Sequence, residues 1–468
     1  MKKNIPLIIF SLVDLILVFV LVILVNRLNI LPFKYLIFII LIILLISVIA
    51  TLFQKLNKKV FKVISYIIFS IILIVSSIGI YYSVVTLSFI NKSFNTIKNT
   101  YTNTFIVVTS KYDDIYDLIN RKVGYYKSIP NIDKTIDKLK SMLEFEDIAY
   151  SNITSLLEDL KSNKIDGLVV EEEIYKSLSG NIKNIPFDKY KSIYSIEITV
   201  DEEISKNDTG DVFNLYISGN DFTNSNSDFN MIITVNRKSK KILLTSIPRD
   251  YNFYMPSLGV NDSLEFASAW GVNVPKEGLE KLLDINIDYY LKIKTQSLVD
   301  LVDTLNGVKF CSDRSFYTTH ATILDSYDDT EGEKLYVKNG CHEYSGVEIL
   351  TIARERLAYR DGDRQRQKNC QQIMINIFNK MLNFDTVFNY VNILDKLSDL
   401  YVTNMPDKLI TGIIKDIIDG NNYDIETQSL DGYANAGYIR AGSIYGYVMT
   451  PYTESVENGS AKIKEVSK

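Results

Sequence analysis

The hydrophobic pattern of the first ninety residues consists of three long apolar runs. They cover Ile5–Val25, Tyr35–Leu52 and Val63–Ile90, and each approaches or exceeds the ~20 residues that a helix needs to cross a bilayer. We expect three transmembrane helices. The first run is not expected to be a cleaved signal peptide, because it is long, lacks a small-residue cleavage site and precedes two further runs.

Basic residues around these runs predict their orientation. Lysines precede the first run and crowd between the second and third, whereas only Arg27 and Lys34 lie between the first and second. Because Lys-rich loops stay in the cytoplasm, we expect a cytoplasmic N-terminus and an extracellular body from about residue 91. Asp14 costs about 2.5–3.5 kcal/mol in mid-span, so we expect it to face another helix.

Residues 100–200 alternate short strands with helical stretches, which predicts a small α/β domain with a parallel sheet. The expected strands are Thr104–Thr109, Lys122–Tyr126 and Gly167–Val170, and the expected helices are Asp113–Asn120, Ile132–Leu143, Ile153–Ser162 and Glu171–Leu178. No residue there carries obvious chemistry. A spacer or a partner-docking role is the expectation for this accessory domain.

From Phe213 onward the pattern changes to strongly alternating strands joined by polar turns. Met231–Asn236 and Lys241–Ile247 flank a hairpin-like turn, and two further strands are expected at Tyr289–Ile293 and Val308–Cys311. Helices are expected at Asp262–Trp270, Pro275–Leu283, Gln296–Leu305, Ser345–Ala353 and Asp363–Leu382. The pattern predicts a mixed α/β domain that is large enough for a core and a pocket.

Charge and composition exclude several function classes. Eight of the 51 Lys and Arg but only one of the 56 acids lie in residues 1–90, so the body is acidic, which argues against broad nucleic-acid binding. The three cysteines lack CxxC spacing, so a structural zinc site is not expected. The only two histidines, His320 and His342, lie in a stretch that is typical of loops, which disfavours a catalytic triad.

A capping box and a pair of arginines mark one helix. Ser345 and Glu348 form the box, and Arg354 and Arg356 follow at the far end of the helix, two residues apart. In an extended exit segment this spacing directs both guanidinium groups to the same side. A solvated charged surface is the alternative interpretation of such runs.

The next helix places an arginine on an apolar face. Arg366 shares this face with Cys370, Ile373 and Ile377, so it points toward the core, where a charge requires an anionic partner. Arg249 follows a strand that ends at Pro248. Several converging arginines would bind a pyrophosphate.

Two acidic residues lie at the edge of the predicted strands. Asp221 follows one strand and Asp228 precedes the next, so together they could hold one Mg²⁺ with water and phosphate oxygens. Asx turns explain the same residues without a metal. Both interpretations remain open from the pattern alone.

These residues together resemble the LytR-CpsA-Psr family of cell-wall glycopolymer ligases, in particular its capsule-type branch with several N-terminal spans and an accessory domain. The resemblance covers about residues 210–455. It rests on an ordered set of motifs: Tyr216-Ile-Ser-Gly-x-Asp221, Asp228 before Ile232–Asn236, Leu243–Asp250, Ile287–Tyr290, Leu301–Val308, Ala353–Arg356, Gly362–Arg366, Ser429–Tyr433 and Thr450–Val456. It implies an α/β fold with a mixed sheet and helices around a lipid-binding groove.

The resemblance also implies roles for individual residues. Arg249, Arg354, Arg356 and Arg366 match the family's pyrophosphate-contacting arginines, Asp221 and Asp228 match its metal-associated carboxylates, and Asp363 matches the acid that orients an arginine. Asp228 is the candidate for orienting the acceptor hydroxyl.

Two positions depart from the family pattern. Asn226 stands where the family usually has an arginine, and Cys370 stands where it has a glutamine; Arg364 and Gln371 are near enough in sequence to substitute for them.

The implied function is a Mg²⁺-dependent phosphotransferase at the outer face of the cell membrane. It would attach a teichoic acid or a capsular polysaccharide from a polyprenyl pyrophosphate carrier to peptidoglycan, with proteins of envelope polymer synthesis as candidate partners. The alternative is a non-catalytic membrane receptor or regulator that binds polyprenyl phosphate or glycan, which the loss of an arginine at Asn226 favours. The expected domains are 1–91 for the three spans, 98–205 for the accessory domain and 206–466 for the ligase-like domain.

Two further expectations concern cysteines and site variants. Cys311 and Cys341 both lie in the exported part and flank one loop, so we expect them to form a disulfide and to leave Cys370 as a thiol. Alanine at Arg249, Arg354 or Arg366 is expected to abolish polymer attachment and to leave the protein folded.

Overall fold

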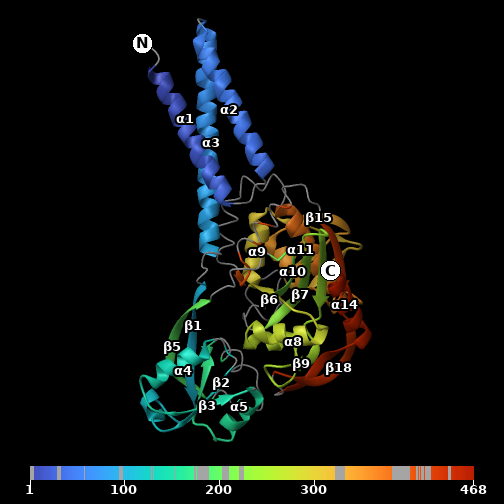
Figure 1. Cartoon of the computed structure of the whole chain (residues 1–468). Helices are drawn as coiled ribbons and strands as arrows, with labels where there is room; N and C mark the ends of the chain where they lie inside the picture. Colours follow the sequence, from blue (N-terminus) through green and yellow to red (C-terminus); the bar gives the residue numbers. More distant parts are fainter. Residues whose placement is uncertain are drawn as a thin grey trace.

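The structure is a computed structural model of the whole chain (Figure 1). It describes all residues except 1–4, 29–32, 57, 94–98, 128, 130, 152, 173–174, 176–188, 203–209, 221–225, 322–332, 382–400, 407–408, 410–411, 413–415, 417–422 and 441–443.

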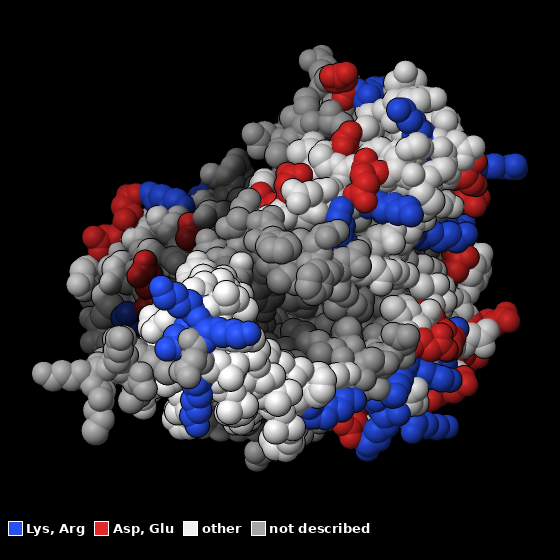
Figure 2. Space-filling view, turned by 90° about the horizontal axis from the view of Figure 1, so that it is seen from above, with Lys and Arg blue, Asp and Glu red and all other residues white. Residues whose placement is uncertain are grey.

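Three helices that are long and apolar enough to cross a membrane form the N-terminal part, as the hydrophobic runs predict. They are α1 (Ile5–Leu28), α2 (Phe33–Lys55) and α3 (Lys59–Ser93), and α1 and α2 both pack along α3 (Figure 1). Asp14 is buried within this bundle, as expected. Seen from above, basic side chains gather over the apolar helices at the end remote from the rest of the chain (Figure 2).

The accessory domain contains a five-stranded sheet in the order β3-β2-β4-β1-β5. Its strands are β1 (Asn99–Thr109), β2 (Lys122–Tyr126), β3 (Glu146–Tyr150), β4 (Gly167–Glu171) and β5 (Lys191–Glu202), and its helices are η2 (Ile115–Leu118), α4 (Ile132–Lys140) and α5 (Ile153–Lys161).

The expectation of a parallel accessory sheet is only half right. β2 runs parallel to β3 and β4, but β1 is antiparallel to both β4 and β5. The sequence analysis missed two strands of this sheet, β3 and the long strand β5, which returns along β1. Most of the helix expected at Glu171–Leu178 lies outside the described residues.

The larger domain is built on a mixed six-stranded sheet in the order β16-β11-β6-β7-β8-β17. β6, β7 and β8 are antiparallel, whereas β11 runs parallel to β6 and β17 runs parallel to β8. The strands are β6 (Val212–Asn220), β7 (Ser227–Asn236), β8 (Lys241–Ile247), β11 (Tyr289–Ile293), β16 (Tyr401–Thr403) and β17 (Asp424–Ser429). The predicted hairpin and the predicted strand at Tyr289–Ile293 are therefore confirmed.

Side chains alternate between the two faces of this sheet, as a period of two requires. One face holds Phe213, Leu215 and Ile217, and the other holds Tyr216 and Leu243. On the Tyr216 face the sheet packs against α7 (Leu264–Ala267), η4 (Ser268–Trp270), α8 (Asn273–Leu283) and the C-terminal helix α14 (Thr453–Val466).

A second core lies between α9 (Thr295–Thr304), α10 (Gly346–Arg354) and α11 (Asp363–Met381). The antiparallel strand pair of β12 (Val308–Ser312) and β15 (Gly340–Tyr344) packs on this core and places Cys311 opposite Cys341. The two cysteines form a disulfide, so that expectation is confirmed. Three further antiparallel pairs involve β9 (Asn252–Met255), β10 (Val260–Ser263), β13 (Phe316–Ala321), β14 (Lys334–Val337), β18 (Gly432–Ile439) and β19 (Ile444–Pro451).

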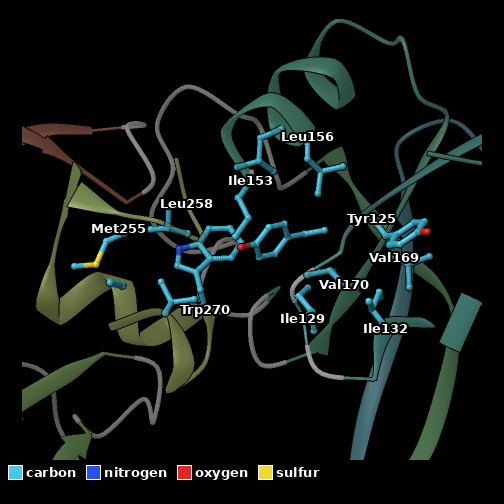
Figure 3. Close-up of a cluster of buried hydrophobic side chains, with 14 of the residues drawn as sticks. Tyr125, Ile129, Ile132, Ile153, Leu156, Val169, Val170, Met255, Leu258 and Trp270 are labelled. Atoms are coloured by element: carbon cyan, nitrogen blue, oxygen red, sulfur yellow. The ribbon is translucent and has the colours of Figure 1, made fainter. Parts of the chain in front are cut away.

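Buried apolar side chains continue from the accessory domain into the larger domain. Ile153 and Leu156 of α5 belong to the same cluster as Leu258 and Trp270, and Figure 3 shows Ile153 pointing toward the Trp270 ring. The accessory domain is thus packed on the larger one rather than held only by its connections.

Candidate active site

Arg249 is the centre of a cluster of acidic residues. It follows β8, and its Nη1 donates a hydrogen bond to Oδ1 of Asp228. Its Nε lies 3.8 Å from Glu265 Oε2 and 4.0 Å from Asp250 Oδ1. Among the described residues this buried Nε has no hydrogen-bond acceptor.

Arg366 is held beside this cluster by two hydrogen bonds. The helix α11 places it on its buried face, as the spacing predicts, with Cys370, Ile373 and Ile377. Its Nε lies 2.6 Å from Asp363 Oδ1, and its Nη1 donates to the backbone oxygen of Asp228 at 2.6 Å. The anionic partner that a buried arginine requires is therefore Asp363, one turn earlier.

The carboxyl groups of the cluster respond differently to burial. Burial raises the pKa of Glu265 to about 7 and also raises that of Asp250, even though Arg249 opposes both shifts. At Asp363 burial acts in the same direction, but the ion pair with Arg366 outweighs it and holds the pKa below its usual value. Asp363 is therefore the permanently charged partner, and Glu265 exchanges its proton near neutral pH.

An apolar pocket adjoins the two arginines. Its volume is about 100 Å³, and residues of β6, β7, α9, α10 and α11 line it. The polar lining consists of Asp228, Lys294, Arg354 and Arg366, whereas Phe229, Leu298, Leu350, Ile373 and Met374 are apolar. The volume is below the 300–1,000 Å³ of typical ligand pockets, so a long apolar chain enters only if the surrounding helices move apart.

The other expected site residues are placed less tightly. Arg354 ends α10 and lines the pocket, and Arg356 is near enough to Asp250 to lower its pKa. Arg364 is half exposed and donates to Asp431 Oδ1 at 2.8 Å, outside the Arg249 cluster. Asp221 lies outside the described residues.

The two residues considered as substitutes, Arg364 and Gln371, are both bonded to partners outside the Arg249 cluster. Gln371 donates to Ser246 Oγ and to the Gln428 backbone oxygen, both at 2.9 Å, so it joins α11 to the sheet. Cys370 is buried and lines the pocket together with Arg366, and burial raises the pKa of its thiol to about 11. Cys370 is therefore an uncharged thiol at neutral pH.

The sequence analysis did not identify Glu265, and it gave Asp250 no role in the site. Glu265 comes to the cluster because its backbone N–H donates to the Arg249 oxygen at 2.8 Å, a contact between segments sixteen residues apart. Asp250 stands in the Pro-Arg-Asp motif, so that motif could have identified it.

Asp228 is the one described residue of the expected Mg²⁺ pair, because Asp221 lies outside the described residues. No group of three or more metal-binding side chains is found in the described part of the chain, and Asp228 is already paired with Arg249. Mg²⁺ is commonly held by one or two carboxylates plus phosphate oxygens and water. Asp228 suits such a site, whereas a cage made only of protein ligands is not formed by the described residues.

Comparison with known proteins gives the family. The LytR_cpsA_psr family model matches residues 180–461, more than half of the chain. Biofilm regulatory protein A of Streptococcus mutans is 31% identical over 188 residues, and this match spans 38% of the chain and 45% of that protein.

Two further relatives carry teichoic acid transferase names. The polyisoprenyl-teichoic acid–peptidoglycan teichoic acid transferase TagU of Bacillus cereus is 26% identical, over 65% of this chain and 94% of its own length. The crystal structure of B. subtilis TagU is 25% identical with a TM-score of 0.41, and covers 55% of this chain and 98% of that one. On the extent of the family match, this chain belongs to the LytR-CpsA-Psr family.

Proposed function

We propose that this chain is a membrane-anchored transferase that moves a glycopolymer, such as a teichoic acid or a capsular polysaccharide, from a polyprenyl pyrophosphate carrier to peptidoglycan outside the membrane. A hydroxyl of the acceptor attacks the phosphorus that carries the polymer. The bond from that phosphorus to the bridging oxygen breaks, polyprenyl phosphate leaves, and the proton of the hydroxyl passes to a carboxylate or to the departing phosphate.

The observation that supports this proposal most directly is the position of the arginines at the polar end of an apolar pocket. Arg354 and Arg366 line the same cavity as Leu298 and Ile373, so one ligand with a charged head and an apolar tail would contact both kinds of side chain. Arginine suits phosphate oxygens because its N–H groups form a planar fork. A polyprenyl pyrophosphate has this combination.

Each step of this reaction can be assigned to particular residues of the site. The guanidinium groups of Arg354 and Arg366, which line the pocket, together with Arg249 and Arg356, would neutralise the pyrophosphate. Asp363 would orient Arg366, with which it is paired. We further propose that Asp228, with Asp221, holds Mg²⁺ together with phosphate oxygens; the ion would supply charge neutralisation at the phosphates.

A non-catalytic receptor is the second candidate, and Asn226 favours it. Its side chain is buried at the edge of β7, two residues before Asp228, and it carries no positive charge. A site with one arginine fewer binds a pyrophosphate but stabilises the transition state less well. Transfer and binding must therefore be measured separately.

The test uses the purified full chain in lipid nanodiscs, with a polyprenyl pyrophosphate-linked glycopolymer and Mg²⁺. Arg354→Ala is compared with Arg360→Ala, an exposed arginine of the same segment. Because a charge-assisted hydrogen bond contributes roughly 1.5–3 kcal/mol, we expect ten- to hundredfold weaker lipid binding for Arg354→Ala only. Binding with no polymer transfer to peptidoglycan would support the receptor. Failure of the unmodified chain to bind would overturn both candidates.

A further inference from the structure

The hairpin of β18 and β19 exposes an unusual number of aromatic rings. Tyr438, Tyr445 and Tyr447 are 59%, 64% and 56% exposed, although tyrosine normally buries most of its ring. The Tyr438 and Tyr445 rings contact each other, with centroids 5.2 Å apart. An exposed aromatic cluster of this kind commonly marks an interaction site.

The register of the hairpin shows that these three rings share one face. Tyr438 pairs with Tyr445 and Ala436 pairs with Tyr447, and paired residues of an antiparallel hairpin project to the same side. Ala436 is exposed opposite Tyr447 and next to Tyr438 on this face, and Ala434 is exposed one step further along β18, so the neighbours of the rings on this strand are small. Val448 and Ile439, on the other face, are buried. We call Tyr438, Tyr445 and Tyr447 with the two alanines the tyrosine face.

The tyrosine face continues into the arginine site. The backbone N–H of Met449 donates to the Asp250 oxygen at 2.8 Å, so β19 is attached directly behind Arg249. Arg364 of α11 contacts Asp431 and the Gly432 oxygen at the start of β18. Burial raises the pKa of the Tyr447 hydroxyl, and Asp250 and Asp363 add to the shift, which places Tyr447 within electrostatic reach of the cluster.

We propose that the tyrosine face binds the glycan strand of the acceptor and presents its hydroxyl to the arginine site, an inference that rests on the proposed transfer reaction. The flat C–H faces of pyranose rings pack on aromatic rings, while tyrosine hydroxyls donate to and accept from sugar hydroxyls. The rings of Tyr438, Tyr445 and Tyr447 lie one after another along β18 and β19, so that successive sugars of a linear glycan could pack on successive rings. Holding the acceptor beside the phosphorus also supplies the orientation that phosphotransfer requires.

The position of the hairpin argues against a membrane as the ligand. Tyrosine is enriched at membrane interfaces, but β18 lies at the end of the larger domain away from α1, α2 and α3, whereas α9 beside the apolar pocket lies near them (Figure 1). The carrier lipid would enter from the membrane side and the acceptor from the opposite side. The two substrates then meet at Arg249 and Arg366.

The experiment measures binding of soluble, uncrosslinked peptidoglycan glycan strands to the full chain in nanodiscs by calorimetry. Tyr445→Ala and Tyr447→Ala are compared with Tyr317→Ala, which removes one ring of another pair of exposed tyrosines in contact, Tyr317 and Tyr336. We expect about tenfold weaker glycan binding for the two hairpin variants and no change for the control. Thermal midpoints should match because all three rings are exposed.

Lipid binding separates this inference from the proposed function. The hairpin variants should bind the polyprenyl pyrophosphate glycopolymer as the unmodified chain does, and show a higher KM for the acceptor in transfer. If all variants bind the lipid, transfer the polymer and bind the glycan with equal affinity, the proposed role of the tyrosine face is wrong and the proposed transferase function still holds. Loss of lipid binding by the unmodified chain would instead overturn the transferase.

Discussion

At the scale of single residues, the arginines of this site hold positions in a network of acids before any substrate binds. Arg366 is 6% exposed and is bonded to Asp363, and Arg249 lies among Asp228, Asp250 and Glu265. Removing one member leaves an opposite charge buried without its partner, which costs roughly 3–5 kcal/mol. Alanine at Arg249 or Arg366, which we expected to leave the protein folded, should therefore lower its free energy of unfolding.

Arg366→Ala should lower the thermal midpoint of the full chain and abolish lipid pyrophosphate binding. The physical reason is that burial raises the pKa of Asp363 once Arg366, the main group that lowers it, is removed, so the buried carboxyl must either stay charged without its partner or take up a proton. The double variant Arg366→Ala with Asp363→Asn should recover most of the midpoint and none of the binding. Equal midpoints of the single and double variants would contradict the pairing, and intact binding in either would contradict the site.

Glu265 should make stability depend on pH. Its pKa is about 7 in the folded chain against an ordinary value of 4.5, so between these values the folded state holds a proton that the unfolded state has lost. Stability therefore falls as the pH rises from about 4.5 to about 7, by roughly 3 kcal/mol, and then levels off.

Glu265→Gln removes this titrating group, so the fall in midpoint between pH 5 and 7.5 should become shallower. Glu457→Gln, at an exposed carboxylate on α14, is the matched control and should follow the unmodified chain. An identical pH profile for Glu265→Gln and the control would show that Glu265 is not buried beside Arg249.

The sequence predicted these residues unevenly. The partnership of Arg366 was foreseen because the period of α11 puts the arginine on an apolar face, and Asp363 followed from the family motif. Glu265 was missed because its position depends on a backbone contact with Arg249 after the chain has turned twice. Arg364 and Gln371 were near in sequence to the departures, but helix rotation directs them to Asp431 and Ser246.

At the scale of elements, patterns that repeat locally were predicted well. Ser345 and Glu348 form the expected capping box, and the boundaries of α10 and α11 differ from expectation by one residue. Strand direction was not foreseen in the accessory sheet, because the antiparallel pairing of β1 with β4 and β5 joins segments that are far apart in the sequence. Local periodicity carries no information on such pairing.

The disulfide should stabilise the antiparallel pair of β12 and β15 and the core between α9, α10 and α11 on which this pair packs. It closes a separation of 30 residues, for which the loss of unfolded-state entropy corresponds to roughly 2–4 kcal/mol. We expect the double variant Cys311→Ala with Cys341→Ala to show faster amide hydrogen exchange in β12 and β15 than the unmodified chain. Exchange in the distant β6–β8 sheet should stay unchanged, and an effect of equal size in both regions would contradict a local role.

At the scale of the whole molecule, the accessory domain and the larger domain share one buried apolar cluster, to which both contribute side chains. Trp270 is the only tryptophan of the chain and lies in the buried cluster shared with Ile153 and Leu156. Composition and periodicity predicted each domain, but the face that each presents to the other depends on the folded surfaces.

The orientation of the bundle decides whether the site can reach a cell-wall acceptor. Lysines at the α2–α3 turn predict a cytoplasmic turn, and three spans then place everything after α3 outside. Protease added to intact protoplasts should remove the body beyond α3 and leave a fragment of about ninety residues in the membrane. Single cysteines can be introduced in a variant that lacks Cys311, Cys341 and Cys370. A cysteine at Asn57 should react with a membrane-impermeant maleimide only after the cells are lysed. A cysteine at Ser312 should react with the same reagent in intact cells. Protection of residues 200–460 from protease would place the arginines in the cytoplasm, and the transfer to peptidoglycan and the tyrosine face would both be wrong.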